Sequence, residues 1–366
     1  MVECRGGRGG STTKNGMTEH ADGRHVSLFR PFTCTISKNG VPLHPKSSRM
    51  NVIDILQSKQ GTAFSYEVLP PLKGTGTEAL FQTIERLQEF EPRYVNITTH
   101  RSEFVYKDIG NGLVQRMSVR RRPGTIAIAA AIQQKYGIHV VPHIVCSGNN
   151  RESVEYMLLD LQFLGVSDLL VLRGDKARED STFQPSDPAL THATDLIGQI
   201  NRFNQGLFHD GTPIKVPGQP FQYGVACYPE KHEEAPNMEA DLDILRRKQD
   251  MGASYAVTQL FYDNACYFRF VERARAAGIH IPIIPGIKPL SKMSQLTVVP
   301  KTFHCDLPEP LYHEAVKCTT DEEMRRVGIE WSVTQCRELK SRGVPSMHFY
   351  TMGAVDSICE IARQVY

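Results

Sequence analysis

The sequence lacks an apolar run long enough to cross a membrane, because no window of about 18 residues is continuously apolar. Its 366 residues, 40% of them hydrophobic, are nevertheless enough for one large core. This combination excludes a membrane-spanning protein. We therefore expect a globular protein without a membrane partner.

Paired cysteines are also missing. The nine cysteines are scattered, with no Cys-x-x-Cys pair and no Cys/His spacing typical of zinc sites. Free thiols in a reducing compartment explain this usage most simply. The cysteine pattern thus predicts a cytoplasmic protein without a metal centre.

Residues 1–49 have no apolar stretch of the signal-peptide kind. They carry eight Lys or Arg against three acidic residues, a formal charge of +5, so the other 317 residues carry −3 of the total +2. The basic character belongs to this segment, and it gives no reason to expect nucleic-acid binding by the rest. We predict a disordered or spurious N-terminal extension over 1–49 and a catalytic domain over 50–366.

Eight apolar segments with strand character alternate with amphipathic helical patterns. The predicted strands are 63–69, 93–99, 139–145, 168–172, 222–228, 255–260, 281–285 and 347–351. The predicted helices are 77–90, 125–136, 151–164, 189–203, 238–251, 264–277 and 321–342, and a further helix can begin at Met50.

This alternation predicts an α/β protein, either a (β/α)8 TIM barrel or a doubly wound open sheet. An open dinucleotide-binding sheet requires a third glycine and an immediate helix after its first strand, and the segment 70–76 supplies neither. The barrel is therefore the favoured architecture.

Polar side chains stand where these strands end. Arg173, Gly174 and Asp175 directly follow the fourth strand. The other strands present Glu67, Thr98, His143, Tyr228 and Gln259. Since the carboxyl ends of barrel strands meet at one end of the molecule, these groups predict the functional site there.

The carboxylates Glu67 and Asp175 leave two chemistries open. A pair of acids at one end of a barrel could cleave a glycosidic bond. Sugar-binding barrels usually bring aromatic platforms, however, and the chain has one tryptophan, Trp331, in a predicted helix. A carboxylate-pair hydrolase is therefore the second hypothesis, and a site for a bound cofactor is the first.

A dense polar set surrounds the fifth strand. Tyr228 and His232 lie on the loop after it, and Asp241, Arg247 and Lys248 lie on the following helix, where their spacing favours one side. Basic groups beside Tyr and His suit a pyrophosphate and an adenosine. A solvated charged helix face is the alternative interpretation.

Seven short motifs, in order from about residue 50 to the end, together resemble the methylenetetrahydrofolate reductase family, in particular its bacterial single-domain members. The motifs lie at 64–71, 142–146, 172–175, 226–232, 258–263, 284–286 and 348–351. The resemblance implies a flavin-dependent (β/α)8 barrel that uses FAD and either NADH or NADPH to reduce 5,10-methylenetetrahydrofolate to 5-methyltetrahydrofolate. It also implies a folate substrate, a ping-pong hydride transfer, a supply of methyl groups for methionine synthesis and a homo-oligomer.

The resemblance assigns roles to individual residues. Glu67 matches the general acid that opens the bridged folate ring, and Asp175 matches the acid beside the flavin. Gln259 and Gln295 match substrate contacts. The positions that match flavin contacts are Thr98, Thr99, His143, Arg173, Gly174, Asp175, Ala193, Tyr228, His232, Asp241, Arg247 and Lys248.

Some positions depart from the family pattern. Ile244 stands where an Asn often contacts FAD, and Ala354 stands where some members place a folate-contacting Arg. Lys288 or Lys292 could instead bind the glutamate tail of the substrate, although both could equally be solvated loop lysines. A catalytically silent folate- or flavin-binding module is the third hypothesis.

Overall fold

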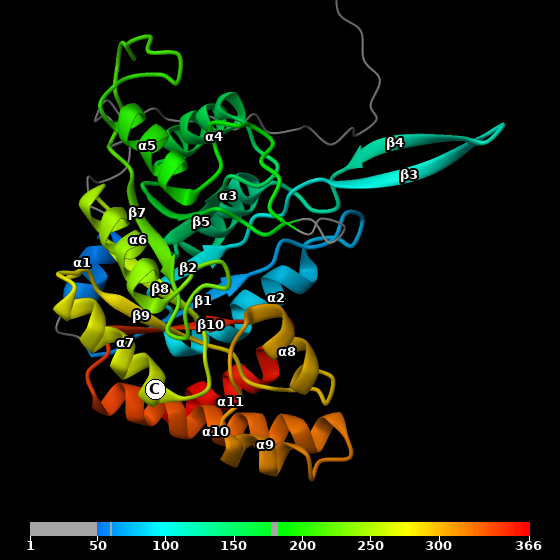
Figure 1. Ribbon diagram of the computed structural model, residues 1–366, viewed down its shortest axis with the longest axis vertical. Coiled ribbons are helices and arrows are strands. Elements are labelled where there is room, and N and C mark those ends of the chain that lie inside the picture. The colour runs from blue at the N-terminus through cyan, green and yellow to red at the C-terminus, as the bar shows by residue number, and fades with distance from the viewer. Residues whose placement is uncertain (1–49, 59–60, 177–181) are drawn as a thin grey trace, which may run out of the picture. The chain divides into compact units, whose positions relative to one another are not determined.

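The computed structural model describes residues 50–58, 61–176 and 182–366. Eight parallel strands close into a barrel in the spatial order β1, β10, β9, β8, β7, β6, β5 and β2 (Figure 1). They are β1 (Ala63–Val68), β2 (Tyr94–Ile97), β5 (Val140–Val145), β6 (Asp168–Leu172), β7 (Gln222–Cys227), β8 (Tyr255–Leu260), β9 (Ile283–Ile287) and β10 (Ser346–Tyr350). The predicted (β/α)8 barrel is confirmed.

Helices connect successive strands and cover the outside of the barrel, as parallel pairing requires. They are α2 (Glu78–Leu87), α3 (Thr125–Tyr136), α4 (Arg151–Phe163), α5 (Ala193–Asn204), α6 (Met238–Asp250), α7 (Asn264–Ala276), α8 (Gln295–Phe303), α9 (Glu309–Ala315), α10 (Asp321–Ser341) and α11 (Val355–Val365), with a short 3-10 turn η1 (Gln88–Phe90) after α2. Within the described part of the chain, no helix is long and apolar enough to span a membrane.

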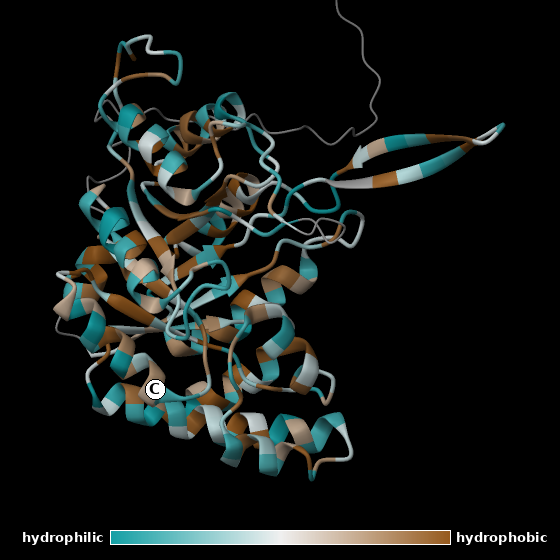
Figure 2. Ribbon diagram, viewed as in Figure 1, coloured by the Kyte–Doolittle hydropathy of each residue, from teal (hydrophilic) through white to brown (hydrophobic). Residues whose placement is uncertain are grey.

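Alternation along each strand separates the two faces of the barrel wall. On β1, Phe64, Tyr66 and Val68 belong to the large apolar cluster beneath the helices. Ser65 and Glu67 occupy the alternate positions and face the barrel interior. Figure 2 shows brown, apolar residues along many of the barrel strands, whereas the hairpin of β3 (Glu103–Gly110) and β4 (Leu113–Val119) and the outer helices mix brown and teal.

The helix predicted to begin near Met50 is α1 (Val52–Gln57), and it covers the amino end of the barrel. The Asn51 side chain caps this helix by accepting a hydrogen bond from the Asp54 amide at 2.9 Å. Val52 donates its amide proton to the buried Asp168 carboxylate at 3.2 Å, and its side chain packs among inward residues of the strands. The functional end is therefore the opposite, carboxyl end.

A buried polar layer crosses the middle of the barrel. The Nδ1 atom of His348 lies 3.1 Å from Ser65 Oγ and 3.3 Å from Asn96 Nδ2. Tyr94 and Ser346 are joined below it, with 3.2 Å between their hydroxyl oxygens. A polar layer of this kind orients the interior side chains more strictly than an apolar core would.

Several elements differ from the sequence prediction. The strand expected at 281–285 is β9 (Ile283–Ile287), two residues later, and α5 begins at Ala193 instead of residue 189. An antiparallel hairpin of β3 (Glu103–Gly110) and β4 (Leu113–Val119), together with α8, α9 and α11, was not predicted. The extension predicted over 1–49 lies outside the described residues.

Candidate active site

Glu67 is the penultimate residue of β1 and lies level with Asn96 of β2 and Tyr350 of β10. Its carbonyl oxygen accepts a hydrogen bond from Thr351 Oγ1 at 2.8 Å. Removal of the carboxyl group from water raises the pKa of Glu67 to about 8, and the nearby Lys288 ammonium opposes part of that rise. At neutral pH Glu67 therefore carries a proton that it can donate.

The next two strands of the barrel are β2 and β5. Thr98 and Thr99 directly follow β2, and His143 lies on β5. Thr98 donates its amide proton to the Val68 carbonyl at 3.1 Å, and the Thr99 hydroxyl donates to the His143 carbonyl. His143 is buried, and its Nε2 atom has no hydrogen-bond partner among the described residues. Burial lowers the pKa of His143 to about 3, and His100 contributes to the shift, so the imidazole is neutral.

Beyond β6, Arg173, Gly174 and Asp175 lie where the sequence predicted. Arg173 forms a two-point ion pair with Glu234, at 2.5 and 3.0 Å. Gly174 has a φ of +82°, and a Cβ on it would lie 2.8 Å from Ser147 Cβ, so a larger residue is excluded. The Asp175 side chain is exposed, and its backbone carbonyl accepts a hydrogen bond from Ser147 Oγ at 3.1 Å.

The structure brings together four of the residues predicted around the fifth strand. The rings of Tyr228 and His232 meet edge to face at 4.6 Å between centroids. His232 donates its amide proton to Asp241 Oδ2 at 2.9 Å, and Lys248 Nζ donates to the Ala226 carbonyl at 3.2 Å. A narrow pocket is lined by Tyr228, Asp241 and Lys248. Burial lowers the pKa of Lys248.

Other predicted residues lie apart from that pocket. Arg247 is exposed on α6, as is Ile244, and Ala193 is the first residue of α5. Gln259 is near the end of β8, where its Oε1 atom accepts a hydrogen bond from the Leu260 amide at 2.9 Å. Gln295 begins α8, and its Oε1 atom accepts from the Ser291 amide at 2.7 Å. The side-chain carbonyl of Gln295 thus stabilises the loop that precedes α8.

The sequence left two interpretations of Lys288, a contact to the glutamate tail or a solvated loop lysine. The interpretation as a solvated lysine is wrong. Lys288 follows β9 directly and is 3% exposed, and its Nζ atom has no hydrogen-bond partner among the described residues. Lys292 is exposed, as a loop lysine would be. Glu234, the partner of Arg173, was also missed. The apolar neighbours of Lys288, Ile287 and Leu290, are a weak signal that separates it from Lys292, which stands between Ser291 and Met293.

The residues at this end fit a bound polar cofactor. His143 presents a buried nitrogen that has no partner among the described residues, and Lys248 places a cation beside a pocket. In contrast, the described residues contain no group of three or more His, Cys, Asp or Glu that could hold a metal ion.

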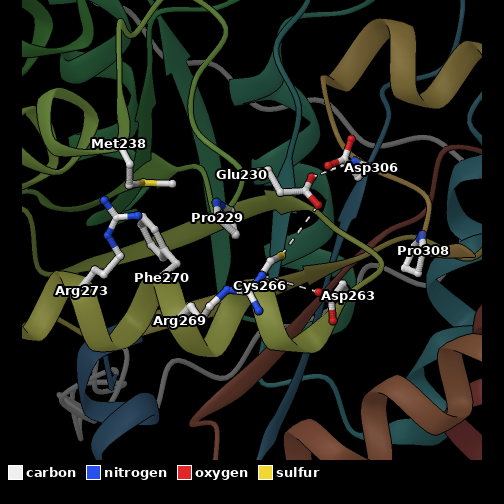
Figure 3. A pocket seen from close by; sticks show the side chains of 10 residues that line it. All are labelled: Pro229, Glu230, Met238, Asp263, Cys266, Arg269, Phe270, Arg273, Asp306 and Pro308. Atoms are coloured by element: carbon white, nitrogen blue, oxygen red, sulfur yellow. Dashed lines mark hydrogen bonds and ion pairs between the residues drawn. The ribbon is translucent and has the colours of Figure 1, made fainter.

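A second cavity of about 400 Å³ lies beside α7 (Figure 3). Glu230 is among the residues that line it, and its carboxylate accepts a hydrogen bond from the Asp306 amide at 3.1 Å and contacts Cys266 Sγ at 3.8 Å. Burial raises the pKa of Glu230 to about 7. None of the residues predicted for the active site lines this cavity.

Comparison with known proteins identifies the family. Residues 52–366 match the family model described as methylenetetrahydrofolate reductase. The chain is 29% identical over 309 residues to methylenetetrahydrofolate reductase 1 of Schizosaccharomyces pombe, covering 84% of this chain and 46% of that protein. It is 28% identical over 293 residues to 5,10-methylenetetrahydrofolate reductase of Pectobacterium carotovorum, covering 80% of this chain and 86% of that protein. The chain therefore spans about half the length of the yeast relative and most of the bacterial one.

A solved structure supports the fold independently. It is an uncharacterized protein from Clostridium thermocellum that binds two copies of 5-methyl-5,6,7,8-tetrahydrofolic acid. The match has a TM-score of 0.50 and 13% sequence identity, and it covers 85% of this chain and 96% of that one. At this identity the likeness concerns the fold alone.

Proposed function

This chain belongs to the methylenetetrahydrofolate reductase family, and from that membership we propose that it reduces 5,10-methylenetetrahydrofolate to 5-methyltetrahydrofolate. The matched region, 52–366, contains all eight barrel strands and the acid Glu67. The proposal includes the supply of methyl groups for methionine synthesis, a cytoplasmic location and assembly into a homo-oligomer.

FAD is the cofactor that we propose, and when bound it would carry hydride from NADH or NADPH to the folate in ping-pong order. His143 would offer its buried nitrogen, and Gly174 would contact the cofactor through its backbone. Lys248 and the Tyr228–His232 pair would hold the phosphate and adenosine parts. Thr98, Thr99, Arg173, Ala193, Asp241 and Arg247 complete the proposed set of contacts.

Glu67 carries the mechanistic part of the proposal. A hydride can add only to an electrophile, so the bridged folate must first open to an iminium ion, and this needs a proton at N10. Glu67 holds its proton at neutral pH because burial raises its pKa to about 8. It is therefore suited to protonate N10, and this single observation supports the assignment best.

The remaining assignments follow from position. Asp175, exposed after β6, would bind the pterin and oppose negative charge on the reduced cofactor. Gln259, at the carboxyl end of β8, would contact the folate and the nicotinamide in turn. Gln295 would contact the folate through its amide NH2 group, since its oxygen already accepts hydrogen bonds from the Ser291 and Lys292 amides.

The experiment is to compare the two half-reactions in Glu67→Gln. We expect the variant to retain FAD and to be reduced by NAD(P)H at a rate close to that of the wild type, because that step needs no proton from Glu67. Reoxidation by methylenetetrahydrofolate should slow by at least about 100-fold, the usual contribution of a general acid. Stopped-flow absorbance of the flavin measures both steps.

Glu85→Gln is the matched control, because Glu85 lies on the exposed surface of α2, and it should change neither half-reaction. Reoxidation of Glu67→Gln at the wild-type rate would remove Glu67 from its proposed role. A colourless protein that gains no activity with FAD would instead contradict the cofactor proposal and support the hydrolase alternative.

A further inference from the structure

Lys288 is an unusual group for the interior of a barrel. It is 3% exposed, and its Nζ atom has no hydrogen-bond partner among the described residues. A buried ammonium without a compensating partner is costly, so a group of this kind usually has a function. The proposed function above gives Lys288 no role.

The register of the strands places Lys288 at the same level of the barrel as Glu67. Glu67 on β1 lies level with Tyr350 on β10, and Phe349 on β10 lies level with Ile287 on β9. Lys288, the residue after Ile287, therefore stands level with Tyr350, two strands from Glu67. Both side chains occupy inward positions of the wall.

Tyr350 lies on the strand between Glu67 and Lys288, and its side chain carries no charge that would affect either group. Its hydroxyl donates to the Thr258 carbonyl at 2.6 Å, and its ring covers Gly286, where a Cβ would lie 2.5 Å from the ring. The pKa of Tyr350 is raised well above its ordinary value by burial, so the phenol is neutral. The same holds for Tyr228, whose pKa is also raised by burial.

The nearby histidines are neutral as well. Burial lowers the pKa values of His143 and His348 to about 3. Lys288 is then the group whose charge acts on Glu67, and Glu67 acts in return on Lys288, whose pKa burial lowers to about 8. Because Lys288 Nζ makes no hydrogen bond to any described residue, this interaction acts through space.

We propose that Lys288 is a positioning residue for the acid function of Glu67, and that its ammonium group sets how readily the Glu67 carboxyl releases its proton. The catalytic meaning of this inference depends on the proposed function, in which Glu67 donates to the folate. The electrostatic coupling itself does not, and it can be measured in the resting protein.

The test is an infrared titration of the Glu67 carboxyl group in the full-length protein without substrate. The protonated carboxyl band is assigned by its loss in Glu67→Gln. In Lys288→Met, which keeps a long apolar side chain but no charge, the midpoint should rise by about 1 pH unit or more, because a favourable opposite charge is gone. In Lys288→Arg, which stays charged at all relevant pH values, the midpoint should fall.

Lys292→Met is the matched control, since Lys292 is exposed on the same segment, and its midpoint should equal that of the wild type. The pH at which folate reduction declines on the alkaline side should move with the infrared midpoint in both Lys288 variants. A loss of activity that is equal at every pH would indicate a merely structural role and would overturn the proposal.

An unchanged Glu67 midpoint in Lys288→Met would also overturn it. If that variant does not fold, Lys288→Arg decides the question through the opposite shift. A shifted midpoint in a protein that reduces no folate would leave the coupling standing and would contradict the proposed function alone.

Discussion

Single ionisable residues inside the barrel determine how this protein responds to pH. Glu67, Lys288, His143 and His348 all have pKa values displaced toward the neutral form by burial. A barrel interior that is polar in its middle layer and ionisable at its carboxyl end suits proton transfer. It also makes the free energy of unfolding depend on pH.

Glu67→Gln should reveal that dependence. The folded protein retains the Glu67 proton up to about pH 8, whereas the unfolded chain releases it near the ordinary value of 4.5. The free energy of unfolding contributed by this group therefore falls as pH rises from 4.5 to about 8. Gln cannot ionise, so the variant should be more stable than the wild type at pH 8, by up to about 4 kcal/mol, and similar to it near pH 4.5. Urea unfolding across this range measures the difference.

Glu85→Gln provides a control with the opposite sign. Hydrogen bonds from Lys135 and Tyr136 lower the pKa of Glu85, so its contribution favours the folded state above its ordinary pKa and is lost as pH falls. Its removal should reduce stability at pH 8. A Glu67→Gln effect that is equal at pH 5 and pH 8 would show that the carboxyl group is ionised in the folded protein.

The sequence predicted the positions of polar residues at strand ends, but it did not predict which side chains interact with them. Glu67, Arg173 and Tyr228 could be placed because each follows an apolar run. Glu234 lies in a polar segment and Lys288 directly follows a strand, and only the closed barrel brings them to Arg173 and Glu67. Pairings between distant strands are set by tertiary structure and leave no local pattern.

At the scale of elements, long periodic segments were predicted well and irregular ones were missed. The β3–β4 hairpin contains a usable signal, because Asn111 and Gly112 both have positive φ and form the turn that Asn-Gly favours. The helix α8 contains Pro300, which obscures its periodicity. The segment that joins β9 to α8 carries Lys288, so the packing of that segment affects the proposed site.

Gly328→Ala tests this packing. Gly328 lies inside α10, and a Cβ there would be 1.9 Å from the carbonyl oxygen of Leu290, two residues beyond Lys288. The backbone would have to move apart, so we expect a loss of about 1–3 kcal/mol despite the better helix propensity of Ala. Denaturant unfolding measures it.

Gly198→Ala is the matched control, because Gly198 lies inside α5 and a Cβ there would meet nothing within 4 Å. It should be neutral or stabilise the protein by up to about 1 kcal/mol. If both substitutions stabilise, α10 does not pack closely against the Leu290 segment.

At the scale of the whole molecule, closure of the barrel explains why one end carries the chemistry. The inward apolar residues and α1 fill the amino end, with Val52, Ile55 and Leu56 buried there. Glu67, His143 and Lys288, whose pKa values are displaced by burial, lie toward the other end. The alternation of strands and helices predicted this architecture. It could not indicate how deeply each polar group is buried.

Removal of residues 1–49 should leave the molecule intact. That segment is basic and glycine-rich and lacks apolar periodicity, so we expect it to add nothing to the core. A chain that begins at Met50 keeps Asn51, whose side chain caps α1. We predict an unchanged melting temperature, FAD content and turnover, measured by calorimetry, flavin absorbance and NAD(P)H oxidation. A chain that begins at Gly61 also loses α1 and should melt several degrees lower, because the apolar residues beneath α1 become exposed. If the Met50 truncation releases FAD or melts as low as the Gly61 truncation, the first 49 residues contribute to the folded barrel and our view of them is wrong.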